Sequence, residues 1–538
     1  MRVKGISSKL IVAIVILIVI VASVSAYFIY TSQRAQLGAP QLERTLIIAI
    51  PEEPEGLDIQ QVTWANEVHG LIYQPLVILG PNMSIVPDLA VSWEVSEDGT
   101  VIIFHLSKDA KFSNGDPLTA EVIKKSIERY KTISPYAEDF ADVERIEVLD
   151  EYTVKLILKR PAPYLWAVLV TVYGAPVNAN VAEKVGDAEF NRNPVGSGPY
   201  KLVEWVRGSH VVLERNEYYK TNIPFVKNKG PNPYIDKVII RFIPEDLTRI
   251  AELEAGRVHI VRGVPLTEVK RLKENPNIQL YETLSPGIHY IMVNVLKEPL
   301  NDVRVRKAIM LAINRDEIAT VLEGNVVPWY SFLSPTNLCF NKTVEELAEK
   351  LYAYNLEKAR ELLKEAGWVD TDGDGIVDKN GVPLKLTLLS AVDDPALKKA
   401  APLIQAHLAK VGIAIEIKEY TYDYVRSLTR EWNFELALRR FSWADPDILI
   451  YLVHSEYGNY TYSNPEVDRL LELGRGVVDM TERTKVYSKV QEILLEDLPL
   501  IPLFVLKEYT AVNKNVKGLI VLPPYGDLII HDAWIEKG

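Results

Sequence analysis

Acidic side chains recur in the segment 370–378 with a spacing that suits a metal ion. Counted from the first of them, carboxylates stand at positions 1, 3, 5 and 9, those of Asp370, Asp372, Asp374 and Asp378. Gly375 takes position 6 and the Ile376 carbonyl position 7, an order in which hard oxygen ligands fold around Ca²⁺. Position 12 is Gly381 and not the bidentate glutamate of an EF-hand, so the pattern predicts a weak, structural calcium site. The alternative is a polar turn that joins a helix to a strand.

The short motifs that carry hydrolytic or nucleotide chemistry are absent from the sequence. There is no Gly-x-Ser-x-Gly elbow, no His-Glu-x-x-His zinc motif, no phosphate loop and no dinucleotide fingerprint. The eight histidines are scattered singly, and the adjacent Asp393 and Asp394 fit a loop better than an acid/base pair. We therefore expect no enzyme and no cofactor other than calcium. A surface hydrolase with widely separated carboxylates is the alternative, and conversion of the ligand on prolonged incubation would reveal it.

Composition narrows the class of protein further. The chain has 538 residues, is 48% hydrophobic and has a net charge of −12. Without the first 36 residues, 56 basic residues stand against 72 acidic ones, a balance of −16 that disfavours nucleic acid as a partner and suits a monomeric surface domain. Cys339 is the single cysteine, so it cannot form an intrachain disulfide, and we expect it to be a small buried residue.

The N-terminus contains an apolar run that can cross a membrane. Residues 10–30 are 21 residues without a charge, and Arg2, Lys4 and Lys9 precede them. This bias places residues 1–9 in the cytoplasm and the body outside, after a linker at 31–43. The run could be a retained anchor, a cleaved secretory signal or an archaeal pilin-type signal, and its length favours retention.

Two further features bear on the exported body. So short a cytoplasmic part argues against a membrane-anchored sensor. Sequons at Asn82, Asn341 and Asn459 are acceptors for glycosylation in an exported protein.

Strand and helix patterns alternate along the body. Strands are expected at 101–106, 152–158, 237–243, 385–389 and 413–418, the last with alternating isoleucines that bury one face. Helices are expected to begin after Asn355, after Asn464-Pro465 and after Asp302, and Gly367 should end the first of them. This alternation predicts α/β lobes rather than a helical bundle or an all-β sandwich.

Several blocks of the chain occur in an order that resembles one family. Two of them read Leu-Ala-Val-Ser-Trp-Glu-Val-Ser-Glu-Asp-Gly-Thr at 89–100 and Lys-Phe-Ser-Asn-Gly-Asp-Pro-Leu-Thr-Ala-Glu at 111–121. Further blocks lie at 195–205, 214–219, 253–257, 302–315, 359–368, 443–447 and 498–502. Together they resemble the family 5 solute-binding proteins of ABC importers, the dipeptide, oligopeptide and nickel binding group, in an archaeal-like form.

This resemblance implies an α/β, bilobed periplasmic-binding-protein type II fold (cluster C) with an extra small subdomain. Lobe I would comprise 44–75, 190–285 and 500–538, with the subdomain at 76–189, and lobe II would comprise 286–499. The chain would cross between the lobes near 285–287 and near 500–502. The ligand would lie in the cleft between the lobes and drive their closure, with a permease and an ATPase as partners.

The resemblance also suggests how a ligand is held. In peptide-binding relatives an aspartate shortly after a tryptophan in the second lobe pairs with the amino terminus of the peptide. The compact sequence Trp443-Ala-Asp445-Pro-Asp447 is similar to that motif, without the tyrosine that often follows. Asp445 is therefore the first choice for an ammonium partner and Asp447 the second, and the alternative is that Asp445 only shapes the turn before the next helix.

A β-linked oligosaccharide is the alternative ligand, because some members of the family bind sugars. Sugars need flat aromatic faces, and several aromatic residues stand near the segments expected to line the cleft: Trp64, Trp329, Trp432, Trp443, Tyr173 and Tyr290. Each of them could equally pack in a core. We expect an oligopeptide rather than an oligosaccharide.

Overall fold

The computed structural model describes residues 44–232, 234–458 and 461–536, and residues from Leu46 onward form one compact unit. Within the described ranges no helix combines the length and apolarity needed to span a membrane. The apolar run predicted at 10–30 lies outside these ranges.

A mixed sheet of twelve strands organises the body. Its strand order is β18-β17-β19-β13-β20-β11-β1-β10-β9-β8, and β12 and β14 pair with β20 beside this order. The strands of its first half are β13 (His289–Val293), β14 (Val326–Pro328), β17 (Lys385–Ala391), β18 (Ala414–Tyr420) and β19 (Leu436–Arg440). Those of its second half are β1 (Thr45–Ile50), β8 (Tyr200–Val206), β9 (His210–Arg215), β10 (Lys237–Phe242), β11 (Ile260–Val261) and β12 (Ile278–Leu284).

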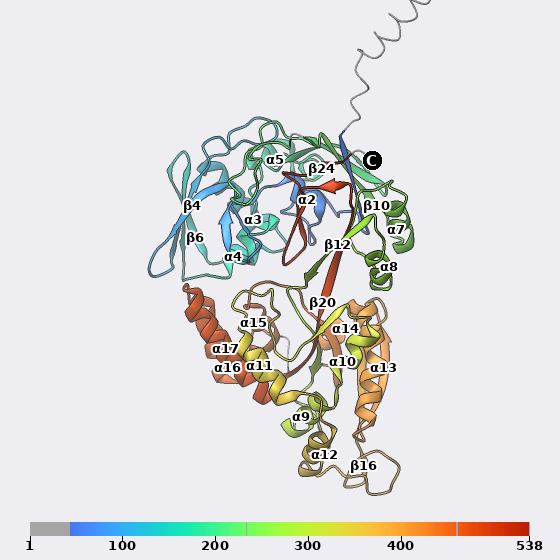
Figure 1. The fold of residues 1–538 in the computed structure, drawn as a ribbon. Helices are drawn as coiled ribbons and strands as arrows, with labels where there is room; N and C mark the ends of the chain where they lie inside the picture. Colours follow the sequence, from blue (N-terminus) through green and yellow to red (C-terminus); the bar gives the residue numbers. More distant parts are fainter. Residues whose placement is uncertain (1–43, 233, 459–460, 537–538) are drawn as a thin grey trace, which may run out of the picture. The chain divides into compact units, whose positions relative to one another are not determined.

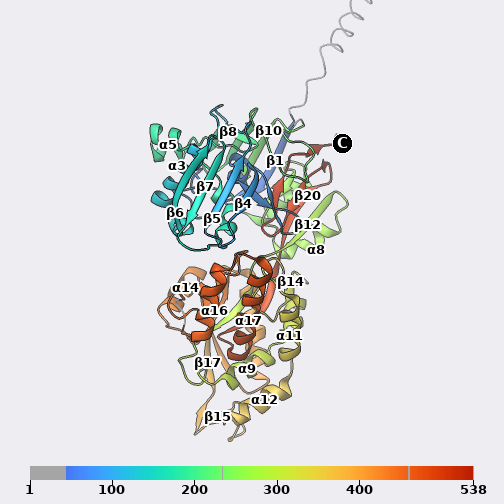
Figure 2. The same ribbon diagram turned by 90° about the vertical axis from the view of Figure 1, so that its left-hand side faces the viewer.

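One long strand joins the two halves. β20 (Leu500–Asn513) pairs with β13 over Leu500–Phe504 and with β12 over Lys507–Asn513. We call lobe II the elements from β13 to α17 with the first half of β20, and lobe I the elements before β13 with the chain from residue 507. Figures 1 and 2 show β20 (red) passing from one group to the other. The boundary predicted at residue 500 coincides with the first residue of β20, and the partners of this strand change between 506 and 507.

Lobe II is helix-rich, and Figure 1 shows α16 and α17 together on one side of it and α13 on the other. Its helices are α9 (Val303–Ala312), α10 (Arg315–Val321), α11 (Lys342–Tyr352), α12 (Leu356–Glu365), α13 (Pro395–Ala409), α14 (Tyr422–Arg430), α15 (Ile448–Val453), α16 (Pro465–Gly476) and α17 (Met480–Asp497). A short hairpin joins β15 (Asp378–Lys379) to β16 (Val382–Pro383). The apolar residues of lobe II form one buried cluster that spans 288–505.

Lobe I contains smaller sheets beside the main one. Four strands pair in the order β4-β5-β7-β6: β4 (Ala90–Val95), β5 (Val101–Leu106), β7 (Thr153–Leu158) and β6 (Val143–Asp150). Three two-stranded sheets are β2 (Val77–Leu79) with β3 (Ile85–Pro87), β21 (Val516–Lys517) with β24 (Trp534–Ile535), and β22 (Ile520–Leu522) with β23 (Asp527–Ile529). The helices are α2 (Glu67–Ile72), α3 (Ala120–Ile133), α4 (Leu165–Leu169), α5 (Ala179–Val185), α6 (Asp187–Phe190), α7 (Asp246–Glu254) and α8 (Val269–Lys273).

Buried apolar clusters separate within lobe I as well. One cluster lies under the four-stranded sheet and draws on 76–170, and another packs against the main sheet. The subdomain predicted at 76–189 and the exact lobe limits remain predictions.

Local patterns in the sequence correspond to the elements observed. The strands predicted at 101–106 and 413–418 are β5 and β18, and the buried Ile413 and Ile415 lie on one face, as expected. Asn355, Asp302 and Asn464 cap α12, α9 and α16 through their side chains. These signals are short-range, because a cap or an alternating strand needs only a few neighbouring residues.

The described sequons differ in accessibility. Asn82 is exposed, and its Oδ1 accepts a hydrogen bond from Ser84 Oγ at 2.6 Å. Asn341 instead caps α11, and its Nδ2 donates to Ser488 Oγ at 2.9 Å. Asn459 lies outside the described residues. A glycan on Asn341 would replace the Nδ2 contact, so Asn82 is the better acceptor of these two, and glycosylation remains a prediction.

Candidate ligand-binding site

The carboxyl ends of parallel strands gather polar side chains at the face where the lobes meet. In lobe II, β17 runs parallel to β19, so Asp394 after β17 and Arg440 at the end of β19 lie at the same edge. In lobe I, β1 runs parallel to β11, and Arg262 follows β11. Ligands of open α/β sheets bind at such edges, because side chains from neighbouring strand ends converge there.

Arg440 presents an anchored guanidinium at this edge. Its Nε donates to Asp394 Oδ2 at 2.9 Å, and the guanidinium lies 5.0 Å from the centre of the Tyr422 ring. Asp394 is fixed in turn, because its Oδ1 accepts the N–H groups of Ala396 and Leu397 at the start of α13. Among the described residues no hydrogen bond engages the two terminal nitrogens of Arg440, whose side chain is 45% exposed. The guanidinium can therefore donate two parallel hydrogen bonds to the carboxylate of a ligand.

Arg262 supports the edge of lobe I. Its guanidinium donates to Glu67, to Thr510 Oγ1 and to the Tyr525 carbonyl, the last at 2.8 Å. Gly526 has φ of 73°, and a Cβ there would stand 2.6 Å from Arg262 Nη1. The turn between β22 and β23 thus packs directly on the guanidinium.

Tyr525, on the same turn, connects the lobes. The Ala444 backbone N–H of lobe II donates to the Tyr525 hydroxyl at 3.2 Å. Burial raises the pKa of Tyr525, so the hydroxyl stays protonated at neutral pH.

Asp527 follows this turn and is exposed to solvent. Its pKa is nevertheless raised to about 6, first by desolvation and against the attraction of Arg262, while Glu67 raises it further. Glu508 on β20 has a raised pKa for the same first reason, and Arg262 and Arg440 oppose that rise. Acidic and basic groups therefore alternate along this face.

Asp445, the predicted ammonium partner, occupies a different environment. It has no exposed surface, and its two carboxylate oxygens accept hydrogen bonds from Arg483 Nη1 and Nη2, both at 2.7 Å. An ammonium group would have to open this fully buried pair. The geometry favours a structural role for Asp445 over the binding of a ligand, because both oxygens of its carboxylate accept from one arginine inside the protein.

Asp447, the second choice, is also buried and paired. Arg475 Nε lies 3.1 Å from its Oδ1, and burial raises its pKa to about 6. The Arg475 guanidinium also lies 4.8 Å from the centre of the Tyr164 ring in lobe I. Asp447 therefore orients a contact between the lobes.

Three of the predicted aromatic residues, Trp64, Tyr173 and Trp443, lie near the inter-lobe face. Trp64 is 72% exposed, and the loop that carries it is held by Tyr173 and Tyr136, whose hydroxyls both donate to the Thr63 carbonyl. Trp443 is half-buried and tied to the first crossing, because its backbone N–H donates to the Pro286 carbonyl at 3.0 Å.

Three other aromatic residues do not reach this face. Tyr290 is fully buried and Trp329 is 6% exposed, and both belong to the core of lobe II. Trp432 is exposed but precedes β19, and its carbonyl accepts from Asn294 beyond the end of β13 opposite to His289. It therefore lies at the far end of the strands that carry Arg440. Packing decided these positions, and the aromatic character of the residues did not reveal them.

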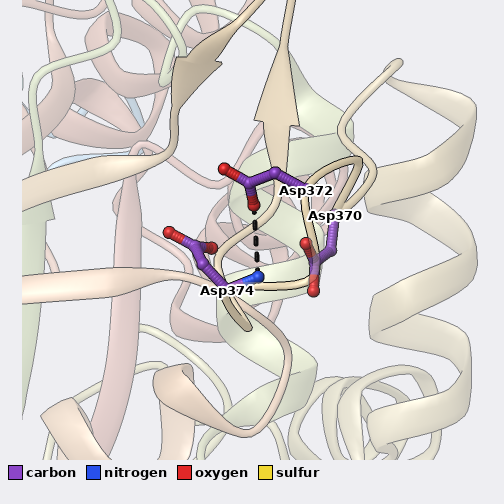
Figure 3. Close-up of side chains that lie close together, drawn as sticks. All are labelled: Asp370, Asp372 and Asp374. Atoms are coloured by element: carbon purple, nitrogen blue, oxygen red, sulfur yellow. Dashed lines mark hydrogen bonds between the residues drawn. The ribbon is translucent and has the colours of Figure 1, made fainter.

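The acidic loop in lobe II brings three predicted ligands together. Oxygen atoms of Asp370, Asp372 and Asp374 lie within 4.8 Å of one another, and all three residues are exposed (Figure 3). Asp370 accepts from the N–H groups of Gly373 and Gly375, at 2.7 and 3.0 Å. The fourth predicted carboxylate, that of Asp378, is outside this cluster, and its Oδ2 accepts from Thr371 instead, while the position of the predicted Ile376 carbonyl ligand stays a prediction.

Comparison with known proteins places this architecture in a family. The model for bacterial extracellular solute-binding proteins, family 5, matches residues 84–461. The chain belongs to the family 5 extracellular solute-binding proteins. Such proteins are extracytoplasmic or periplasmic, and they deliver peptides or related ligands to ABC importers without chemical conversion, so the chain is a substrate-binding protein and no enzyme.

Individual relatives show the breadth of the family. The probable D,D-dipeptide-binding periplasmic protein DdpA of Escherichia coli K12 is 30% identical over 451 residues, which cover 81% of this chain and 82% of the relative. The oligopeptide-binding protein AppA of Bacillus subtilis, solved with a nonapeptide, has a TM-score of 0.71 at 25% identity and covers 93% of this chain and all of its own. NikZ of Campylobacter jejuni, solved with Ni(L-His), has a TM-score of 0.72 at 26% identity, with coverage of 88% and 95%.

Sequence reasoning missed Arg262, Arg440, Tyr525 and Asp527. The signal available for Arg440 and Arg262 was their position directly at the carboxyl ends of apolar strand patterns. Tyr525 and Asp527 had no such signal, since the chain reaches this face only after its last crossing.

Proposed function

We propose that the protein binds oligopeptides between its lobes and that closure of the lobes delivers them to an ABC permease. The observation that carries this proposal is the Arg440 guanidinium, anchored through Nε and open at both terminal nitrogens. A neutral oligosaccharide offers the two terminal nitrogens no charged acceptor, whereas the terminal carboxylate of a peptide can accept a hydrogen bond from each of them. The bound peptide in a related structure of the same fold supports the same ligand class.

Three further observations weaken the oligosaccharide alternative. Tyr290 and Trp329 are core residues, and Trp432 is remote from Arg440. Only Trp64, Tyr173 and the half-buried Trp443 remain from the predicted aromatic set.

A ligand screen tests the proposal. The full-length chain in detergent is mixed with short free peptides, with their C-amidated forms and with cello- and xylo-oligosaccharides, and the melting temperature and Kd are measured. Free peptides are expected to bind, and Arg440→Gln should weaken them roughly 10- to 100-fold, the equivalent of about 1.5–3 kcal/mol for a charge-assisted bond.

Arg145→Gln is the matched control, because Arg145 lies on β6 with a side chain that is 62% exposed. C-amidated peptides should bind wild type and Arg440→Gln alike. A response to the oligosaccharides alone would refute the peptide proposal.

We also propose that residues 10–30 are retained as a membrane anchor that holds the body at the outer face of the membrane. The basic residues before the apolar run support this orientation. The family's extracytoplasmic location agrees with it.

We propose that the acidic loop 370–378 binds Ca²⁺ weakly and serves the stability of lobe II, not ligand capture. Three clustered carboxylates support the proposal. Millimolar calcium should raise the melting temperature of the full-length chain, and Asp372→Asn should abolish that rise, because Asp372 donates a ligand oxygen without bonding the glycine N–H groups that Asp370 holds. Absence of heat in a calcium titration would remove the site.

A further inference from the structure

We infer that Asp527 is the carboxylate that holds the ammonium group of the ligand, in the role that the sequence suggested for Asp445. The inference rests on the proposed peptide ligand and names the residue that recognises its amino end.

The other carboxylates near the face already have partners, including Glu508, which has a side-chain hydrogen bond with Ser285. Asp445 is enclosed by Arg483, and Asp447 is paired with Arg475. Glu67 accepts from Arg262, and Asp394 accepts from Arg440 and from the start of α13. Asp527 is different. Its side chain is exposed, and within the described parts of the chain the carboxylate makes no hydrogen bond and no ion pair. It is thus free to bind a ligand.

Asp527 also lies close to a point where lobe I touches the segment 443–447 of lobe II. Two residues before it, the Tyr525 hydroxyl accepts the N–H of Ala444, the residue between Trp443 and Asp445. Arg262 holds the Tyr525 carbonyl, and Gly526 packs on the guanidinium, so the turn is fixed. A side chain at the end of this turn is therefore held in place on lobe I, two residues from the contact with lobe II.

The surrounding charges favour a cation at this point. Arg262 forms an ion pair with Glu67, so Asp527 keeps an uncompensated negative charge. Arg262 acts electrostatically on both Asp527 and Glu508, and Glu508 in turn feels Arg440. An acidic group and an open guanidinium therefore belong to one strip of charged residues, which suits a zwitterion whose two ends carry opposite charges.

The test compares free peptides with their N-acetylated forms. Asp527→Asn keeps the shape of an exposed side chain, so its ligand-free melting temperature should equal that of wild type. Its affinity for free peptides should fall roughly 10- to 100-fold, and its affinity for N-acetylated peptides should not change. Asp109→Asn, on an exposed turn of the four-stranded sheet, controls for the change in net charge.

Acid should reproduce the effect in wild type. The charged groups that face Asp527 are Arg262 after β11 and Glu67 on α2, and they hold each other as an ion pair. Because the pKa of Asp527 is about 6, affinity for free peptides should decline as pH falls below that value, and Asp527→Asn should lack this decline.

The outcomes separate the two proposals. If wild type binds peptides but Asp527→Asn discriminates free from acetylated peptides as wild type does, the role of Asp527 is wrong and the peptide function stands. If Asp445→Asn alone loses that discrimination at an unchanged melting temperature, Asp445 is the ammonium partner. If wild type binds no peptide, the proposed function fails, and this inference fails with it.

Discussion

Arg483→Met is expected to destabilise the protein by about 3–5 kcal/mol, the usual cost of removing one partner from a buried ion pair. Both side chains of the Asp445–Arg483 pair have 0% exposure, and the arginine also donates from Nε to the Gly474 carbonyl at 3.0 Å. The variant leaves the Asp445 carboxylate buried without a counter-charge. Thermal and denaturant unfolding of the full-length chain measure the loss.

A double variant and a surface variant complete this experiment. Asp445→Leu combined with Arg483→Met should be less destabilised than the sum of the two single changes, because neither charge is then left alone. Arg469→Met breaks an exposed pair with Glu466, whose side chains are 58% and 52% exposed, and should cost less than about 1 kcal/mol. If Arg483→Met lost no more stability than Arg469→Met, the structural role of the Asp445–Arg483 pair would be wrong.

Gly287→Ala is expected to cost about 3 kcal/mol and to weaken ligand binding as well. A Cβ at Gly287 would stand 1.8 Å from the Phe441 carbonyl oxygen, so the backbone must shift. Overpacking usually lowers the free energy of unfolding by about 1–3 kcal/mol, and we expect the upper end of this range because the obstacle is backbone. The obstacle lies between the first crossing of the lobes and the segment that carries Arg440 and Trp443. Unfolding and peptide titration should both report the change.

Gly70→Ala is the matched control for this substitution. Gly70 is exposed in α2, and a Cβ there meets no atom within 4 Å. Alanine in a helix should stabilise the protein by up to about 1 kcal/mol. Equal stability of the two alanine variants would show that the close approach at Gly287 relaxes without cost.

Much of the fold was readable from short stretches of sequence. The alternating isoleucines of β18 and the caps Asn355 and Asn464 form as expected. In each case both partners of the interaction are close together in the sequence, so the local pattern is enough to predict the structure. The order of the sequence blocks was enough to place the chain in its family.

The site was readable only in part. The segment 443–447 does lie at the inter-lobe face, since Ala444 contacts Tyr525 there. Its two acids were nevertheless assigned to the ligand, because sequence spacing cannot show that Arg483 and Arg475, on or beside the last helices of lobe II, reach back to them. The same limit applies to Tyr290 and Trp329, whose rings entered the core.

The sequence by itself therefore determined the α/β class, the capped helices, the acidic loop and the family. Only the tertiary structure decided which acidic groups are already paired and which one stays open. Four separate parts of the chain supply Arg262, Asp394, Arg440 and Asp527. Strand ends and the returning strand β20 bring these parts to one face. Local residue patterns encode local contacts, whereas the partner of a buried charge depends on packing between residues far apart in the chain.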